Sequence, residues 1–209
     1  MEFDRRRERM VERLRERGAI DRESTADALR SVPRHAFVPG GNRGVAYEDR
    51  PLPIGEGQTI SAPHMVASML DRLALEPGDR VLEIGTGCGY HAAVTAEVVG
   101  AGNVYSVEYV PELADRARET LEELGYEVAV RTGDGHEGWP AHAPYDAAYL
   151  TCAAESVPPA VVEQVRPGGR LLAPVGDRRQ QLVRLTVKED GRTERETFEG
   201  VRFVRMQGE

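Results

Sequence analysis

The stretch VLEIGTGCG (Val81–Gly89) decides the fold of this 209-residue chain. Its first part continues an apolar run over 80–84 that is typical of a buried strand, and a helical pattern begins at Tyr90, directly after it. The three glycines between them let the backbone turn sharply and let a ligand lie against it. A turn without a ligand is the alternative, but three glycines cost conformational entropy and add no packing.

Downstream of this turn, the pattern alternates between strands and helices. Strands are predicted over 80–84, 103–107, 127–131, 145–150 and 170–175, and helices over 90–99, 111–124 and 158–165. Repeated β-α-β units with short connections indicate a mostly parallel sheet with helices on both faces, an α/β Rossmann-like doubly wound fold. Residues 181–188 and 193–204, around a Glu-Asp-Gly turn, predict a C-terminal β-hairpin at the sheet edge.

The first part of the chain predicts a helical extension and a long loop. One helix is expected over 4–17, and a second begins at Asp21 or Ser24. Residues 33–63 are rich in Pro and Gly and predict an irregular segment, which at that length is usually functional. We expect a single domain over 1–209, divided into an N-terminal part (1–78), a ligand-binding core (79–176) and the hairpin region (177–209), with a helix over 65–75 joining the first two parts.

Composition excludes several classes of function. A net charge of −8 argues against a nucleic-acid surface, and no apolar run approaches the roughly 20 residues of a membrane helix. The charged N-terminus lacks the apolar core of a signal peptide, so a cytoplasmic location is expected. Two cysteines without a C-x-x-C pattern indicate reduced thiols, and the spacing of His35, His91 and His142 predicts no metal site and favours surface or core roles.

Acidic residues at the ends of successive predicted strands indicate which ligand the glycine turn holds. Glu83 precedes the turn, where a carboxylate would repel a pyrophosphate but favour a cationic ligand with an amino-acid head. Glu108 ends the next strand and suits two ribose hydroxyls, and Asp134 follows the third strand and suits an adenine amino group. This pattern favours S-adenosylmethionine over NAD.

The segment GEGQTISAPHM (Gly55–Met65) places hydroxyl groups and small side chains just before a helical pattern. No histidine–aspartate pair or metal-binding spacing accompanies them in the sequence. Ser61 is therefore either a cap for the helix that begins near Pro63 or part of a reaction site.

These segments together resemble the protein-L-isoaspartate O-methyltransferase family within the class I S-adenosylmethionine-dependent methyltransferases. The glycine turn marks only the superfamily, whereas YEDRPLPI (Tyr47–Ile54) and QTIS (Gln58–Ser61) are typical of the family. The resemblance spans roughly residues 10 to 206 and also includes VPRHAFVP (Val32–Pro39), GDGHEGWP (Gly133–Pro140), RPGGRL (Arg166–Leu171) and VRFV (Val201–Val204).

The resemblance implies methyl transfer to the α-carboxylate of L-isoaspartyl residues in damaged proteins, giving a labile ester that reverts through succinimide. Such a reaction needs alignment of its reactants rather than a metal or strong base. The resemblance assigns the catalytic position to Ser61. Separately, we expect the protein to be a monomer. The cofactor contacts that the resemblance implies are Thr59, Ile60, His64, Glu83, Gly85, Thr86, Gly87, Cys88, Glu108, Tyr109, Asp134 and Gly135.

Two departures from the family pattern leave other functions open. Glu155 stands where the family usually has proline, and Val204-Arg205-Met206-Gln207 replaces a common Val-Pro-Leu-Thr. A related carboxyl methyltransferase with another protein or small-molecule substrate is one alternative. The other is a protein that binds S-adenosylmethionine without transferring its methyl group.

Overall fold

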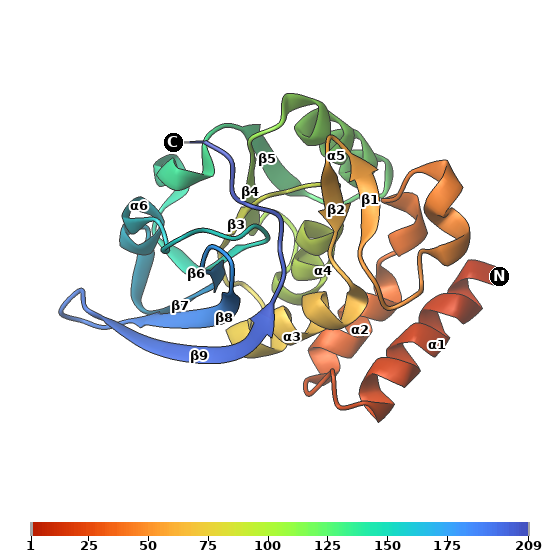
Figure 1. Cartoon of the computed structure of the whole chain (residues 1–209), viewed down its shortest axis with the longest axis horizontal. Coiled ribbons are helices and arrows are strands. Elements are labelled where there is room, and N and C mark those ends of the chain that lie inside the picture. The colour runs from red at the N-terminus through yellow and green to blue at the C-terminus, as the bar shows by residue number, and fades with distance from the viewer. Residues whose placement is uncertain (1, 209) are drawn as a thin grey trace.

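A seven-stranded sheet forms the centre of the computed structural model, which describes residues 2–208 (Figure 1). The order of its strands is β5-β4-β3-β6-β7-β8-β9. Their bounds are Val81–Ile84 (β3), Val104–Glu108 (β4), Val128–Thr132 (β5), Tyr145–Leu150 (β6), Val165–Val175 (β7), Gln180–Val187 (β8) and Thr193–Val201 (β9). Strands β3 to β7 are parallel, and β8 and β9 are antiparallel. The order changes direction between β3 and β6, which is where ligands bind in open α/β sheets.

Helices cover both faces of this sheet, as the sequence predicts, but unequally. Val81 of β3 packs into the larger core with helices α3 (Pro63–Leu73), α4 (Tyr90–Val99) and α5 (Pro111–Glu123). Its neighbour Leu82 faces the opposite side. On the described residues, the helical cover of that face is the short helix α6 (Pro159–Glu163) with the 3₁₀ turns η3 (Gly135–Glu137) and η4 (Pro140–His142).

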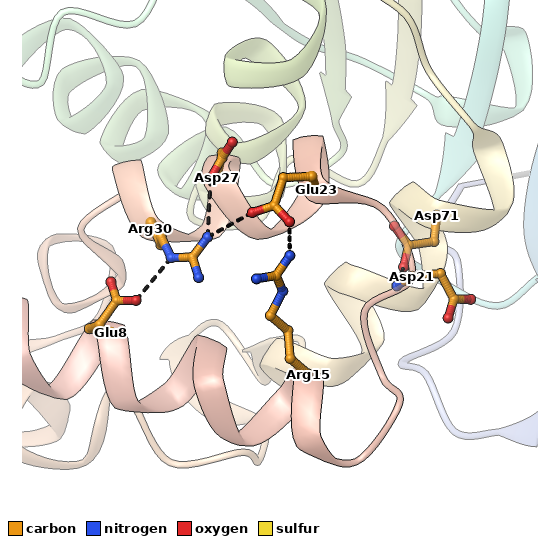
Figure 2. Close-up of polar contacts among 7 residues, drawn as sticks. All are labelled: Glu8, Arg15, Asp21, Glu23, Asp27, Arg30 and Asp71. Atoms are coloured by element: carbon orange, nitrogen blue, oxygen red, sulfur yellow. Dashed lines mark hydrogen bonds and ion pairs between the residues drawn. The ribbon is translucent and has the colours of Figure 1, made fainter.

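Two N-terminal helices, α1 (Glu2–Glu16) and α2 (Glu23–Ser31), are joined by an ion-pair network (Figure 2). Arg30 of α2 contacts Glu8 of α1 at 3.0 Å as well as Glu23 and Asp27 of its own helix. The predicted start of α2 at Asp21 or Ser24 is wrong, because Arg22 is the N-cap and makes no side-chain cap. The Asp21 N–H donates instead to Oδ2 of Asp71 in α3 at 2.6 Å, which holds the helices together.

The Pro- and Gly-rich segment 33–63 is more ordered than the sequence predicts. Besides the 3₁₀ turns η1 (Arg34–Ala36) and η2 (Gly40–Val45), it contains a two-stranded antiparallel sheet of β1 (Leu52–Gly55) and β2 (Gln58–Ile60). Leu52 pairs with Ile60 and both side chains are buried. This sheet fixes the backbone that leads into Ser61.

The chain after β9 turns back over the sheet, and it is the blue trace that runs to the C-terminal end in Figure 1. Arg205 forms a β-bridge with Ala153, and the Met206 N–H donates to the Ala153 carbonyl at 2.8 Å. The predicted hairpin is confirmed, although β9 ends at Val201 and the following residues form this returning segment. Among residues 2–208, no helix is long and apolar enough to cross a membrane.

Candidate active site

A single cavity lies at the carboxyl ends of β3 and β4 and brings together most of the residues that the sequence singles out. The cavity and its mouth enclose about 750 Å³ of empty space. Its wall comes from β2 and the start of α3, from the glycine turn, from the ends of β4 and β6, and from the returning C-terminal segment. The predicted residues in the wall are Thr59, Ile60, Ser61, Gly85, Thr86, Gly87, Cys88, Glu108, Tyr109 and Gly135.

The glycine turn has the left-handed backbone that favours glycine. Gly85, Gly87 and Gly89 have φ values of +95°, +56° and +87°. A Cβ atom on Gly85 would lie 2.3 Å from Oγ1 of Thr151, whose hydroxyl donates to the Gly85 carbonyl. Position 85 therefore needs glycine for two reasons: the positive φ of its backbone and the close approach of the Thr151 side chain.

Glu108 ties the glycine turn to the end of β4. Its Oε2 atom accepts a hydrogen bond from the Gly87 N–H at 2.8 Å, and Oε1 accepts one from the Val110 N–H at 3.0 Å. The residue is 6% exposed and lies in the cavity wall. A carboxylate held in this way is placed for a ligand with hydroxyl groups.

Glu83 lies beneath the cavity wall rather than in it. It is fully buried and accepts hydrogen bonds from the hydroxyl groups of Ser106 and Tyr149, the second at 2.9 Å. Thr86 Oγ1, in the wall, lies 2.6 Å from Ser106 Oγ. Burial raises the pKa of Glu83 to about 8, although these hydrogen bonds oppose the shift. At neutral pH its protonated form supports the turn from below.

Asp134 and His64 are next to the cavity but outside its wall. Oδ1 of Asp134 accepts from the His136 N–H at 2.9 Å and lies 2.8 Å from Nδ1 of the same histidine. Gly208, near the end of the chain, lies close to this carboxylate, because a Cβ atom on it would be 2.5 Å from Oδ1 of Asp134. His64 is half-exposed and pairs with Asp49, with 2.8 Å between Nδ1 and Oδ1.

Ser61 does not cap the helix that follows it. The N-cap of helix α3 is Ala62, and no side chain of that residue caps the helix. The His64 N–H, in the first turn, donates instead to Oδ1 of Asp49 at 3.0 Å. No hydrogen bond joins the Ser61 hydroxyl to any other described residue, and Ser61 lines the cavity. The capping interpretation of Ser61 is therefore wrong, and its hydroxyl is free for another partner.

His91 is a site residue that sequence reasoning missed. It lines the cavity, is 6% exposed, and neither ring nitrogen has a hydrogen-bond partner among residues 2–208. Its ring lies 4.5 Å from that of Tyr149, and burial lowers its pKa to about 3, so it is neutral. Its position two residues after the glycine turn was the available signal.

The remaining features of the site are its two cysteines and its lack of a metal-binding cluster among the described residues. Cys88 and Cys152 both line the cavity, and both are free thiols. Burial raises the pKa of Cys88 to about 11 and that of Cys152 to about 12. Within the described part of the chain, no three His, Cys, Asp or Glu side chains cluster in a way that could hold a metal ion.

The direction change at β3, the glycine turn and the acidic strand ends together define a Rossmann-like methyltransferase. Residues 5–209 match the model of protein-L-isoaspartate(D-aspartate) O-methyltransferase, and the chain belongs to that family. Protein-L-isoaspartate O-methyltransferase 2 of Archaeoglobus fulgidus is 53% identical, covering 100% of this chain and 96% of that protein. The protein-L-isoaspartate O-methyltransferase of Methanopyrus kandleri is 52% identical over 99% of this chain and 93% of its own length.

Solved structures agree with this assignment. A protein-L-isoaspartate O-methyltransferase is 32% identical with a TM-score of 0.89, and the match covers 97% of this chain and 66% of that longer chain. A putative protein-L-isoaspartate O-methyltransferase from Plasmodium falciparum, solved with S-adenosyl-L-homocysteine, is 26% identical with a TM-score of 0.86. That match covers 96% of this chain and 98% of the other.

Proposed function

We propose that this protein transfers a methyl group from S-adenosylmethionine to the α-carboxylate of L-isoaspartyl residues in damaged proteins. In the methyl ester the leaving group is methanol, which departs far more readily than the oxygen of a free carboxylate. The neighbouring backbone nitrogen therefore attacks the ester carbonyl, expels methanol and closes a succinimide, whose hydrolysis restores some normal aspartate. The observation that carries this proposal is the position of Ser61. Its unpaired hydroxyl lines the same cavity as the glycine turn and Glu108.

The cavity wall fits the proposed cofactor. The imidazole of His91 has no hydrogen-bond partner among residues 2–208, and a buried polar group without a hydrogen bond is costly, so it needs a polar partner from a ligand. Gly85 and Gly87 would hold the methionine part against bare backbone, and Glu108 would accept the ribose hydroxyls. Gly135, in the wall beside Asp134, would lie against the adenine.

When bound, S-adenosylmethionine supplies a methyl group that is already activated on a sulfonium. The substrate carboxylate is ionised at neutral pH, so the protein needs no strong base. Ser61 would donate a hydrogen bond that orients this carboxylate, and the apolar side chains of Ile60 and Val66 would exclude water. The raised pKa of Cys88 keeps its thiol protonated, so it does not compete for the methyl group.

The proposal also covers the oligomeric state of the protein, its location in the cell and its binding to nucleic acid. We propose a cytoplasmic monomer that does not bind nucleic acid. Tyr109 and Leu124 are the large apolar side chains exposed on the described residues, which gives little apolar surface for an interface. The net charge of −8 disfavours a polyanion. Light scattering during size-exclusion chromatography, run with and without an oligonucleotide, tests the monomeric state and the absence of nucleic-acid binding.

The decisive experiment supplies radiolabelled S-adenosylmethionine and two matched peptides that differ only in carrying isoaspartate or aspartate. We expect a base-labile methyl ester on the isoaspartyl peptide alone. Equal labelling of both peptides, or labelling of neither, would contradict the proposal. Calorimetric binding of S-adenosylhomocysteine separates the alternatives, because a protein that binds it and labels neither peptide has another substrate or no catalytic role.

A further inference from the structure

Arg205, which departs from the family pattern, lies where three hollows of the surface meet. It lines the mouth of the candidate active site, a hollow beside Glu155, and a groove on its other side. The groove lies between the β7–β8 loop and the segment after β9. The cavity and the groove therefore adjoin at Arg205, which lines both.

The groove is strongly basic in an otherwise acidic protein. Its wall contains Arg178, Arg179, Arg202 and Arg205 but only one acidic residue, Asp177, whereas the whole chain has a net charge of −8. Arg205 pairs with Asp177. The other three arginines are exposed and form no ion pair or hydrogen bond with the described residues. Three guanidinium groups are thus available to a partner.

The two segments that carry these arginines are held together. The Gln180 side-chain amide donates to the Phe203 carbonyl at 3.1 Å and accepts from the Phe203 N–H at 2.6 Å. A Cβ atom on Gly176, at the start of the loop, would lie 2.1 Å from the Arg179 carbonyl oxygen, so the loop is tightly folded. The arginine side chains therefore project from a constrained backbone.

We propose that this arginine groove binds acidic side chains that flank the methyl-accepting residue, so that the enzyme prefers isoaspartyl sites in acidic segments. This inference rests on the proposed function and names its substrate class. Guanidinium groups pair with carboxylates in two-pronged hydrogen bonds, which suits Asp and Glu side chains on an extended peptide. The overall negative charge repels such peptides, and a local basic groove offsets that repulsion where the substrate must dock.

The test compares isoaspartyl peptides of equal length whose flanking residues are either three glutamates or three glutamines. Steady-state methylation gives KM and kcat, and fluorescence anisotropy of the same peptides with S-adenosylhomocysteine present gives Kd without any turnover. We expect the acidic peptide to have a KM and a Kd roughly 3- to 10-fold lower at low salt, with kcat unchanged, because each exposed pair is weak. The advantage should disappear near 1 M salt, where charges are screened within about 3 Å.

The double variant Arg178→Glu/Arg179→Glu should reverse this preference. The matched control is Arg5→Glu/Arg9→Glu, which changes the net charge equally on exposed residues of α1 that line neither the cavity nor the groove. The control should keep the preference, and both variants should bind S-adenosylhomocysteine as the parent does.

Equal Kd values for the two peptides, or an unchanged preference in Arg178→Glu/Arg179→Glu, would overturn the inference. An oligonucleotide that binds more tightly than the acidic peptide and is lost in that variant would overturn it in favour of a nucleic-acid groove. A failure of the proposed function gives a different result. In that case no isoaspartyl peptide is methylated, while the anisotropy comparison still decides whether the groove selects acidic peptides.

Discussion

The hydroxyl group of Tyr149 donates a hydrogen bond to Oε1 of Glu83 across 2.9 Å, in a part of the core that water does not reach. Both side chains lie under the glycine turn, and Thr95 on α4 contacts the same hydroxyl at 2.9 Å. The support beneath the cofactor cavity is therefore a buried polar network, and its protonation state affects the stability of the whole fold.

Stability should fall as pH rises through the titration of Glu83. Burial raises its pKa from the ordinary 4.5 to about 8 in the folded protein. Folding therefore takes up a proton between these values, so the contribution is complete below pH 4.5 and is lost as pH approaches 8. Glu83→Gln removes this titration. Urea unfolding of both proteins from pH 5 to 9 should show a steeper decline for the parent, and parallel profiles would contradict this assignment.

Asp49→Ala should weaken the start of α3. Oδ1 of Asp49 accepts hydrogen bonds from the backbone of His64 and lies 2.8 Å from its ring, so the change removes a helix cap. We expect a loss of about 1 kcal/mol in the free energy of unfolding. Asp49→Asn keeps an acceptor oxygen and should lose less. Chemical unfolding measures both, and an Asp49→Ala protein as stable as the parent would show that the cap is unimportant.

Ser61→Ala should lower turnover by about 10- to 100-fold, because misplacing a reacting group is costly. Binding of S-adenosylhomocysteine should change less than twofold, and the free energy of unfolding should be nearly unchanged, since Ser61 caps no helix. Single-turnover kinetics and calorimetry separate these effects. Unchanged turnover would remove Ser61 from the reaction.

Gly85→Ala should be much more harmful than Gly191→Ala. Both glycines have positive φ values, +95° and +78°. The added Cβ would lie 2.3 Å from Thr151 at the first site but would meet nothing within 4 Å at the second. Subtracting the loss of unfolding free energy in Gly191→Ala from that in Gly85→Ala isolates the steric cost, which we expect to be about 1–3 kcal/mol. Equal losses at the two sites would show that only the backbone conformation matters.

His91→Leu should stabilise the ligand-free protein while weakening its ligand binding. An apolar side chain of similar volume removes two unpartnered ring nitrogens, which should raise the free energy of unfolding by about 1 kcal/mol. Loss of a polar contact should weaken S-adenosylhomocysteine binding several-fold. Thermal unfolding with and without this ligand measures both effects, and His142, outside the cavity, serves as the control site for the same change. Unaltered affinity would exclude His91 from the binding surface.

Long periodic patterns made the sheet predictable from the sequence. The helix at Tyr90–Val99 and the strand at Tyr145–Leu150 begin and end where the pattern predicts, because most of the residues in each are buried. The small sheet over 52–60 was not predicted, because Pro53 and the turn residues Gly55, Glu56 and Gly57 obscure the alternation of apolar and polar residues in its strands. Its stability comes from packing with distant residues, which no local pattern records.

The glycine turn and the acidic strand ends identified the cavity because backbone geometry and chain order determine their positions. Chain order did not reveal that Glu83 is buried below the wall or that Asp49 caps α3, since both depend on which way a side chain points. His91 was missed for the same reason: its importance comes from having no partner, and only the assembled core shows that.

The returning C-terminal segment makes the cavity a late product of folding. Its wall includes Gln58 and Gln207, which lie far apart in the sequence, so a growing polypeptide has no complete binding surface until nearly all of it has emerged and packed. Ligand affinity therefore reports on the integrity of the entire domain. A saturating ligand, at about 100 times its Kd, should add roughly 2.7 kcal/mol to the free energy of unfolding of the whole protein.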